Sequence, residues 1–375
     1  MTICVGLMSG TSLDGVDAVA CEIDGDVSSP RIKPLANAKM KYPAKLRERL
    51  LAISVKPTTT AEICLLNTEV AEVFSKAAIA VMNTPEMKKR RVDIIGSHGQ
   101  TIWHAPEKGA TLQIGSGPII AARTGVRTWF DFRQADMARG GQGAPLAPIV
   151  HAPLFGDSVK SVVALNLGGI ANLTHIPAGT RDLKKLLACD SGPGNMLIDH
   201  AVQKAFGKSY DKGGAAARLG KVDDLLLEDL LSHPYFSRKP PKSTGREEFG
   251  PGAIEKRLGL KIKWNKNTIA TMTELTAVSV GREIKKLAKS GRRTDRLVIC
   301  GGGAKNKYLV ERIAANIGNG VEVVTSAKTG IPPEIVEGLL MALLAWYADK
   351  GVKLDLSDIT GAKGGPAPLG VLAPA

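Results

Sequence analysis

The sequence has few aromatic residues, which make up 4% of its 375 positions, and it has only five cysteines. The cysteines are scattered and form no CxxC pair, so neither a disulfide framework nor a zinc cluster is expected. No apolar run reaches the length that a bilayer requires, and the first residues lack the basic and apolar segments of a secretory signal. These absences predict a protein of the cytoplasm with no membrane partner.

The formal net charge of +14 is the feature that most suggests a nucleic-acid partner. The basic residues are dispersed over several short clusters, however, and no aromatic side chains are interleaved with arginine. The composition therefore argues against nucleic acid and favours small anions, such as phosphorylated or carboxylated substrates. A hydrophobic content of 44% with 23% charged residues is normal for a soluble globular enzyme.

The length suits two domains, and the two halves of the chain open alike. Residues 3–23 and residues 162–176 each show an alternating apolar pattern, a glycine turn and a second alternating pattern. This repeat predicts two α/β domains that face each other across a cleft. We expect an N-terminal domain over 1–140 and a C-terminal domain over 141–332, with a helix in 333–375 packing back on the first.

The loop MSGTSLDG joins the first two predicted strands. Gly10 and Gly15 permit positive φ, so that successive backbone N–H groups can converge on an anion, and Asp14 could hold Mg²⁺ or its waters. An ordinary polar hairpin explains the stretch equally well. A Walker A motif and a dinucleotide-binding turn are excluded, because no lysine follows and the loop joins two strands. Its hydroxyl donors are Ser9, Thr11 and Ser12.

Two further glycine turns extend this pattern. Gly168 and Gly169 lie in a predicted hairpin, which a simple turn explains by itself, but a hairpin in each domain could grip a polyphosphate from both sides. A run of three glycines follows a buried strand and precedes a helix, where the backbone could approach a nucleoside or its α-phosphate. A tight strand–helix turn is the alternative. The run consists of Gly301, Gly302 and Gly303.

Asp190 ends a buried strand and precedes a Ser-Gly-Pro-Gly turn. A carboxylate at the end of such a strand faces a cleft in α/β sheets, where it can act as a general base. The alternative is that Asp190 caps the following helix, although Ser191 or Asn195 could do so instead.

Several other polar residues could contact a substrate. His98 and His104 are six positions apart with no third ligand nearby, which favours hydrogen bonding over metal binding. Arg133 and Arg139 could bind a carboxylate, with Asp136 orienting one of them, although surface ion pairs are the usual role of such residues. Glutamates also begin the apolar C-terminal helix, where they commonly complement the helix dipole. These are Glu334 and Glu337.

Six motifs, in this order along the chain, resemble those of the anhydro-N-acetylmuramic acid kinases. The resemblance covers essentially the whole chain, and the first motif alone nearly identifies the family. The glycine at position 338 departs from the family pattern, in which alanine follows the helix glutamate. The motifs are GLMSGTSLDGVD, SHGQTIWH, FRQADMARGGQGAPLAP, LNLGGIANLT, CDSGPGN and GIPPEIVEGLLMALLAW.

The resemblance implies a two-lobed α/β fold of the actin, Hsp70 and sugar-kinase type, with ribonuclease H-like duplicated domains and an ATP cleft between them. It implies that ATP and Mg²⁺ serve to phosphorylate O6 of 1,6-anhydro-N-acetylmuramate while water opens the anhydro bridge. The product is N-acetylmuramate 6-phosphate, and the step recycles cell-wall sugar. The family also suggests a homodimer.

The resemblance also implies roles for individual residues. Asp190 matches the catalytic aspartate of the family, and Glu337 matches the helix glutamate that faces the sugar. Asp14 is expected to serve Mg²⁺ through water. Further expected sugar contacts are His98, Arg133 and Asp136. The expected ATP and phosphate contacts are Ser9, Gly10, Thr11, Ser12, Leu13, Asp14, Gly15, Val16, Asp17, Gly168, Gly169, Gly301, Gly302 and Gly303.

Two other functions share some of these features. One is a kinase for an ordinary hexose-type sugar, in which Asp190 would deprotonate a hydroxyl group. The other is an actin- or Hsp70-like ATPase whose output is conformational. The sequence shows no long substrate-binding domain or polymer-forming insertion, which argues against the second.

Overall fold

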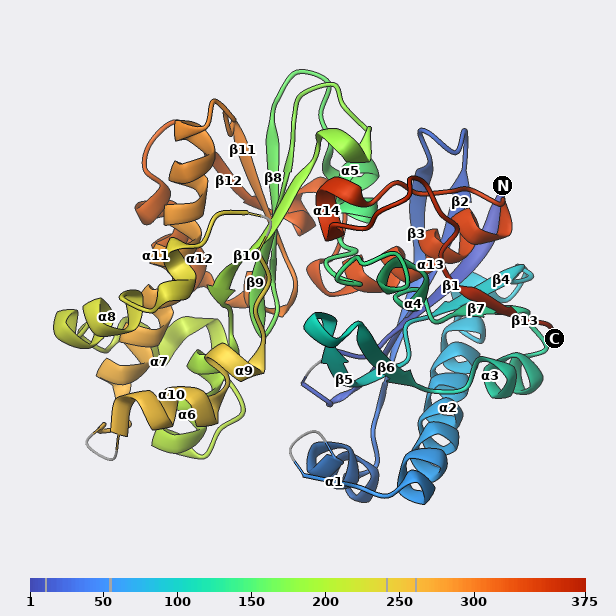
Figure 1. Ribbon diagram of the computed structural model, residues 1–375, viewed down its shortest axis with the longest axis horizontal. Helices are drawn as coiled ribbons and strands as arrows, with labels where there is room; N and C mark the ends of the chain where they lie inside the picture. The colour runs from blue at the N-terminus through green and yellow to red at the C-terminus, as the bar shows by residue number, and fades with distance from the viewer. Residues whose placement is uncertain (11, 54–55, 241, 260–261) are drawn as a thin grey trace. The chain divides into compact units, whose positions relative to one another are not determined.

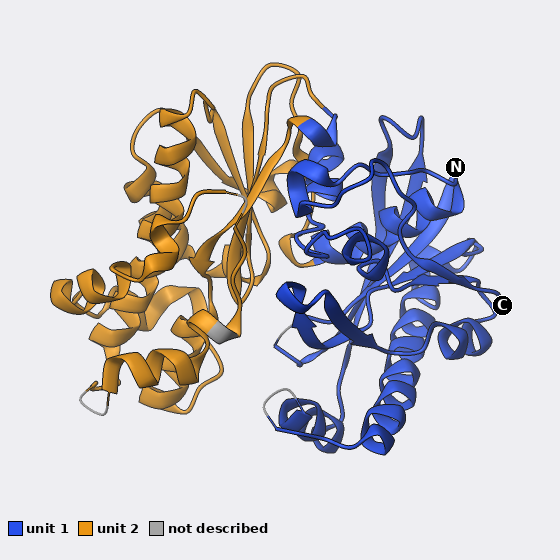
Figure 2. Cartoon of the chain, viewed as in Figure 1, with its two compact units in different colours: residues 1–154, 181–184, 335–375 blue, residues 155–180, 185–334 orange. Residues whose placement is uncertain are grey.

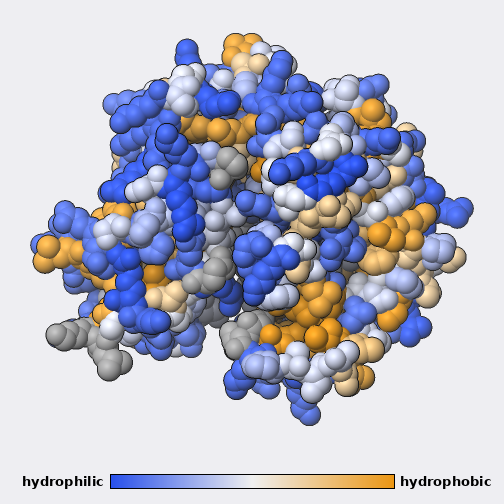
Figure 3. All heavy atoms as spheres, in the orientation of Figure 1, coloured by the Kyte–Doolittle hydropathy of each residue, from blue (hydrophilic) through white to orange (hydrophobic). Residues whose placement is uncertain are grey.

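The computed structural model describes residues 1–10, 12–53, 56–240, 242–259 and 262–375 (Figure 1). Thr11, one of the expected phosphate contacts, lies outside these residues. No helix in the described part of the chain is both long and apolar enough to cross a membrane. On the face drawn in Figure 3, hydrophilic residues predominate and apolar residues gather in separate patches.

The chain forms two compact units, each built from more than one segment (Figure 2). Unit 1 consists of Met1–Leu154, Arg181–Lys184 and Ile335–Ala375. Unit 2 consists of Phe155–Thr180 and Lys185–Glu334. The border expected after residue 140 therefore lies inside unit 1, and the C-terminal segment clusters with unit 1.

Unit 1 contains a six-stranded mixed sheet in the order β13-β7-β4-β1-β2-β3. β1, β2 and β3 pair antiparallel, and β4 and β7 run parallel to β1. A separate hairpin, β5 (Gln100–Ala105) and β6 (Ala110–Ile114), follows β4. The strands of the main sheet are β1 (Thr2–Met8), β2 (Gly15–Asp24), β3 (Arg31–Lys41), β4 (Ile94–Ser97), β7 (Thr128–Phe130) and β13 (Val371–Ala373).

Unit 2 repeats this plan with a five-stranded sheet in the order β10-β9-β8-β11-β12. Its first three strands pair antiparallel, and β11 and β12 run parallel to β8. The shared strand order confirms the predicted duplicated, ribonuclease H-like α/β fold. The strands are β8 (Val162–Leu167), β9 (Ile170–Ile176), β10 (Leu187–Pro193), β11 (Arg296–Cys300) and β12 (Glu322–Thr325).

The long helix of unit 1, α2 (Thr60–Met82), begins after a threonine cap. The Oγ1 of Thr59 accepts the N–H of Glu62 at 3.1 Å, which satisfies one of the free donors of the first turn. The apolar face of α2 packs on the core side of β1 and β2. The other α-helices of unit 1 are α1 (Ala44–Ile53), α3 (Gly117–Thr124), α4 (Gln134–Met137), α13 (Val336–Asp349) and α14 (Ser357–Thr360), and α5 (Pro148–Phe155) ends at the border.

The opposite face of the unit 1 sheet is covered by α13 at very close range. A Cβ atom on Gly6 of β1 would lie 1.8 Å from the carbonyl oxygen of Gly338, and one on Gly96 of β4 would lie 2.0 Å from that of Met341. On Gly338 itself, a Cβ atom would meet Val19 Cγ2 at 2.4 Å. Because successive residues of β1 alternate between faces, Val5 points to α2 and Gly6 points to α13.

The first turns of two helices show where each helix starts. The apolar C-terminal helix was expected to begin at Pro332 and Pro333, but a 3₁₀ turn occupies Pro333–Ile335 and α13 starts at Val336. Glu337 therefore lies in the first turn of α13. The long helix of unit 2, α11 (Lys266–Lys289), begins after Asn265, whose Oδ1 accepts the N–H of Asn267 at 2.8 Å.

The helices of unit 2 surround a second apolar core, in which most of α11 is buried. A 3₁₀ turn, Gly302–Lys305, separates β11 from the next α-helix. The α-helices are α6 (Met196–Phe206), α7 (Ala215–Arg218), α8 (Asp224–Leu231), α9 (Arg246–Phe249), α10 (Pro251–Leu258), α11 and α12 (Lys307–Ile317).

Candidate active site

The first loop, residues 8–15, is closed from within by the hydroxyl of Ser9. This Oγ is buried, 2.8 Å from the carbonyl oxygen of Gly15 and 2.6 Å from Oε1 of Gln100, and it accepts the hydroxyl of Tyr42 at 3.2 Å. Ser9 thus stabilises the loop rather than presenting its hydroxyl to solvent. The exposed hydroxyl is that of Ser12, which donates to Oδ1 of Asp14 at 2.7 Å.

The backbone of the first loop differs from the prediction at one position. Gly10 does not adopt a left-handed conformation, whereas Leu13 does, with φ of +53°. The buried Leu13 side chain joins the core, and its carbonyl oxygen accepts the Nε–H of Arg47 at 2.9 Å. Gly15 is required for space, because a Cβ atom there would lie 2.3 Å from the carbonyl oxygen of Met40.

The carboxylate of Asp14 is paired with a lysine from a neighbouring strand. Lys39 Nζ lies 2.7 Å from Oδ2 of Asp14 and 3.5 Å from Oδ1 of Asp17. Partial burial opposes ionisation of Asp14, but the hydrogen bonds from Lys39 and Ser12 outweigh it and lower the pKa of the carboxyl group. Val16, another expected phosphate contact, has its side chain fully buried in the core.

His98, Arg133 and Glu337 form a second cluster in unit 1, which we call the His98 cluster. Arg133 donates its Nε–H to Nε2 of His98 at 3.1 Å, and His98 Nδ1 lies 2.9 Å from the carbonyl oxygen of Gly99. Since a guanidinium only donates and a carbonyl only accepts, the imidazole is neutral with its proton on Nδ1. His98 and Arg133, 35 positions apart, are thus in contact, and the charge of Glu337 acts on Arg133.

Burial shapes the electrostatics of this cluster. Burial, and then the charge of Arg133, lower the pKa of His98 to about 3. Burial lowers the pKa of Arg133 itself to about 10, and the negative charge of Glu337 acts in the opposite direction. At neutral pH the cluster therefore combines a neutral imidazole with a half-buried guanidinium, on which the charge of Glu337 also acts.

The carboxylate of Asp136 organises a loop instead of orienting an arginine. Its Oδ2 accepts the N–H of Gly143 at 2.7 Å, and its Oδ1 accepts the hydroxyl of Thr360 at 2.6 Å. The expected pairing of Asp136 with Arg133 or Arg139 is replaced by other contacts, since Arg139 Nη1 donates to the carbonyl oxygen of Gly365 at 2.7 Å. Asp136 thus supports the segment that carries Arg133.

In unit 2, Gly168 and Gly169 form the second loop, between β8 and β9. Their carbonyl oxygens accept the N–H groups of Asn195 and Gly194, both at 2.8 Å. Asn195 Nδ2 also donates to the carbonyl oxygen of Leu167 at 2.9 Å. The segment that follows Asp190 is therefore hydrogen-bonded to the second loop. The CDSGPGN and LNLGGIANLT motifs would need to be adjacent in this way to bind one ligand.

The run Gly301–Gly303 packs against the same segment. Gly301 has a φ of +78°, and a Cβ atom there would lie 2.3 Å from Oδ1 of Asn166. A Cβ atom on Gly303 would lie 2.8 Å from Oδ1 of Asn195, whereas Gly302 faces open space. The run leads into a 3₁₀ turn and not directly into α12, so the predicted helix N-terminus at the glycines is displaced to Lys307.

Asp190 lies within β10 and not at its end. The strand continues to Pro193, with a register shift between Asp190 and Gly192. Such a bulge changes the direction of the side chain that it carries. Asp190 is half-buried, and its Oδ2 accepts the N–H of Thr244 at 2.8 Å.

The neighbours of Asp190 hold its backbone as well. Its N–H donates to the carbonyl oxygen of Lys242 at 3.0 Å, and its carbonyl oxygen accepts the hydroxyl of Tyr235 at 2.8 Å. Lys242 in turn pairs with Glu283 of α11 at 2.8 Å, and both side chains are almost fully buried. A buried ion pair thus anchors the segment next to the carboxylate.

The comparison that decides the family covers nearly the whole chain. The family model for anhydro-N-acetylmuramic acid kinase matches residues 2–375. The chain belongs to the anhydro-N-acetylmuramic acid kinase family. The enzyme of that name from Gloeobacter violaceus is 42% identical to it over 100% of this chain and 99% of the relative. The one from Shewanella oneidensis is 41% identical, over 96% of this chain and 95% of the relative.

Solved structures resemble this member of the anhydro-N-acetylmuramic acid kinase family more distantly. The activator of the 2-hydroxyisocaproyl-CoA dehydratase from Clostridium difficile, with bound ADPNP, is 12% identical with a TM-score of 0.44, over 94% of this chain and 99% of that chain. A likeness at this level adds nothing to the strand order and the family match.

Sequence reasoning missed several residues of this anhydro-N-acetylmuramic acid kinase family site. Lys39 of β3 and Tyr42, which follows that strand, lie outside the quoted motifs, and Gln100 lies in the SHGQTIWH motif but was not singled out. All three reach the first loop from elsewhere in the chain. Thr244 likewise reaches Asp190 from outside the quoted motifs. For Lys39, the pattern that could have helped was the alternation of β3, because it predicts that every second side chain of the strand lies on one face.

The described residues of this family member contain no group of three or more His, Cys, Asp or Glu side chains placed to hold a metal ion. Asp14 is half-exposed and lies beside the hydroxyl of Ser12. A single carboxylate of this kind fits Mg²⁺, which keeps several waters and takes further oxygen ligands from a bound nucleotide.

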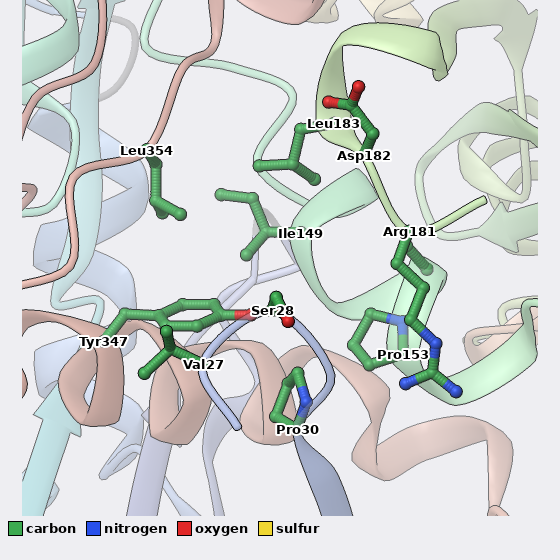
Figure 4. A pocket seen from close by; sticks show the side chains of 11 residues that line it. Val27, Ser28, Pro30, Ile149, Pro153, Arg181, Asp182, Leu183, Tyr347 and Leu354 are labelled. Carbon is green, nitrogen blue, oxygen red and sulfur yellow. The ribbon is translucent and has the colours of Figure 1, made fainter. Parts of the chain in front are cut away.

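The described residues line two pockets. One, of about 430 Å³, follows the glycine run in unit 2 and is lined by Ala304, Lys305 and Glu334 among others. The other, of about 340 Å³, lies in unit 1 and none of the predicted site residues lines it. Figure 4 shows Tyr347 and Arg181 at its sides, with the Tyr347 hydroxyl directed toward Ser28.

Proposed function

We propose that this chain transfers the γ-phosphoryl group of ATP to O6 of 1,6-anhydro-N-acetylmuramate while water opens the anhydro bridge. The products are N-acetylmuramate 6-phosphate and ADP, and the step recycles cell-wall sugar. The observation that carries the proposal is the family match over residues 2–375. Relatives of 42% and 41% identity bear the name of the same kinase over nearly their full length.

Asp190 is the proposed general base. In the anhydro-sugar O6 is a bridging ether without a proton, so a base beside it would have nothing to remove. The base instead takes a proton from the water that attacks C1, the C1–O6 bond breaks, and O6 receives the γ-phosphoryl group as ADP leaves. A carboxylate held by the N–H of Thr244 on a bulged strand is suited to this role.

The His98 cluster is the proposed sugar-binding site. Arg133 carries a positive charge that matches the lactyl carboxylate of the substrate, and guanidinium–carboxylate pairs give both affinity and orientation. Its Nε–H is used by His98, which leaves the terminal N–H groups directed elsewhere. Glu337, in the first turn of α13, supplies an acceptor for sugar hydroxyls.

The glycine loops are the proposed ATP site. Phosphoryl transfer depends mainly on positioning and on neutralising the charge of the phosphates. In unit 1 the first loop carries Ser12 and Asp14, and in unit 2 Gly302 faces open space. Bound Mg²⁺ would neutralise charge on the phosphates, with Asp14 as its protein contact through water.

The test is a turnover assay with anhydro-N-acetylmuramate and ATP in ¹⁸O-labelled water. Label at C1 of a phosphorylated product supports the hydrolytic reaction. Phosphorylation without label would instead indicate a simple sugar kinase with Asp190 acting on a hydroxyl group. ATP hydrolysis that ignores the sugar would indicate an ATPase with conformational output.

A further inference from the structure

Two positive side chains reach the first loop from outside it. Lys39 on β3 binds the carboxylate of Asp14 at 2.7 Å, and Arg47 on α1 donates to the carbonyl oxygen of Leu13 at 2.9 Å. The loop itself contains no basic residue. Charge that a Walker A motif supplies with its own lysine is therefore present here on neighbouring elements.

The pairing of β2 and β3 places Lys39 at the loop. In the antiparallel register Lys39 lies opposite Asp17, and Lys41 lies opposite Gly15. Gly15 has no room for a side chain, because a Cβ atom would lie 2.3 Å from the carbonyl oxygen of Met40. β3 is thereby held directly against the end of the loop, and the position of Lys39 follows from the sheet.

The ammonium group of Lys39 has hydrogen-bonding capacity for a ligand. It has three N–H donors, of which one is used by Asp14 at 2.7 Å and a second points to Asp17 at the longer distance of 3.5 Å. The side chain is 45% exposed, so a ligand can reach it. The positive charges of Lys39 and Arg47 balance the negative charges of Asp14 and Asp17. A bound Mg²⁺ would therefore make the loop positive.

We propose that Lys39 binds the β- and γ-phosphate oxygens of ATP, and that Asp14 and Asp17 hold its ammonium group in place for this contact. This inference rests on the proposed function, because it requires that the chain binds ATP at the first loop. It assigns to Asp14 a second task beside any contact with Mg²⁺, since its two carboxylate oxygens already bind Lys39 and Ser12.

The experiment measures equilibrium binding of AMPPNP with Mg²⁺, and of AMP, by calorimetry. Lys39→Met should weaken AMPPNP binding about 10- to 100-fold, as expected for one charge-assisted hydrogen bond, and should change AMP binding less than about twofold. Lys39→Arg should restore most of the affinity for AMPPNP. The matched control is Lys33→Met on the same strand, which lies opposite Glu22 at the other end and should bind both nucleotides as the wild type does.

The outcomes separate this inference from the proposed function. If the wild type does not bind AMPPNP, both fail. If it binds AMPPNP and Lys39→Met binds it equally well, only the role of Lys39 fails. Equal weakening of AMPPNP and AMP, with no recovery in Lys39→Arg, would reduce Lys39 to a structural role and also overturn the inference.

Discussion

Arg133 donates its Nε–H to Nε2 of His98 at 3.1 Å, and this contact acts together with burial to keep the imidazole neutral. His98 cannot become protonated on Nε2 without losing the bond and facing the guanidinium charge. The proton on Nδ1 is held by the carbonyl oxygen of Gly99 at 2.9 Å. The imidazole therefore adds no second positive charge beside the guanidinium.

Arg133→Met should raise the Kd for anhydro-N-acetylmuramate about 10- to 100-fold, because the substrate carboxylate loses its charged partner. Arg133→Lys should recover part of the affinity. Calorimetric titration with the sugar measures the effect. Arg123→Met, which removes a surface ion pair with Glu72, is the control and should bind the sugar normally. Normal binding by Arg133→Met would remove this residue from the sugar site.

His98 should remain neutral down to about pH 4, since burial lowers its pKa to about 3. The folded protein then binds fewer protons than the unfolded chain between this value and the ordinary histidine pKa near ~6.5. The free energy of unfolding should therefore rise with pH across this window, by up to ~1.4 kcal/mol per pH unit for each such histidine, and level off above it.

Nitrogen-detected NMR of the histidine rings checks this prediction directly. It should report a neutral His98 with the proton on Nδ1 at pH 6 and at pH 7.5. A His98 signal that titrates near pH 6.5 would contradict it. His200, which is 2.9 Å from Glu255, provides an internal comparison within the same spectrum.

Asp190→Asn should reduce turnover about 10²- to 10⁴-fold, the usual contribution of a general base, and should leave ATP binding nearly unchanged. Asparagine keeps the acceptor for the N–H of Thr244, so the bulge in β10 is retained. Steady-state rates and nucleotide titration measure the two effects separately. Asp224→Asn at the start of α8 is the control, and a rate in Asp190→Asn equal to that of this control would reject the assignment.

Gly338→Ala should destabilise the fold by about 1 kcal/mol, because overpacking against Val19 outweighs the gain in helix propensity. Val19→Ala should partly relieve the effect in the double variant, since it removes the Cγ2 atom that lies 2.4 Å from the added carbon. Urea unfolding measures all three variants. The control is Gly252→Ala in α10, where nothing lies within 4 Å, and which should be neutral or stabilising.

The fold was predictable from the sequence because the same strand–turn–strand pattern occurs twice, at residues 3–23 and 162–176. Alternation identified the strands of both repeats. The sequence pattern could not show which residues of neighbouring strands lie beside each other. Lys39 and Asp14 are close only through the register of β2 and β3, which no local pattern encodes.

The sequence named candidate site residues but could not give their conformations or contacts. Of the two glycines expected to permit positive φ, Gly15 has a φ of +153° but Gly10 does not. Leu13 takes a left-handed conformation instead, and burial of its side chain offsets the backbone cost. Asp136 was expected beside an arginine, but Thr360 arrives from a segment more than two hundred positions away. Gly338, which departs from the family pattern, is explained only by the presence of Val19.

The close fit of α13 on Gly6 and Gly96 has a consequence for synthesis of the chain. The ribosome synthesises the first strands of unit 1 early and α13 only after unit 2. One face of the unit 1 sheet therefore lacks its covering helix while unit 2 is being made. During that interval a bare glycine-lined sheet face is open to chaperones or to aggregation. Truncation of the last forty residues should therefore leave an insoluble protein, however complete unit 2 is.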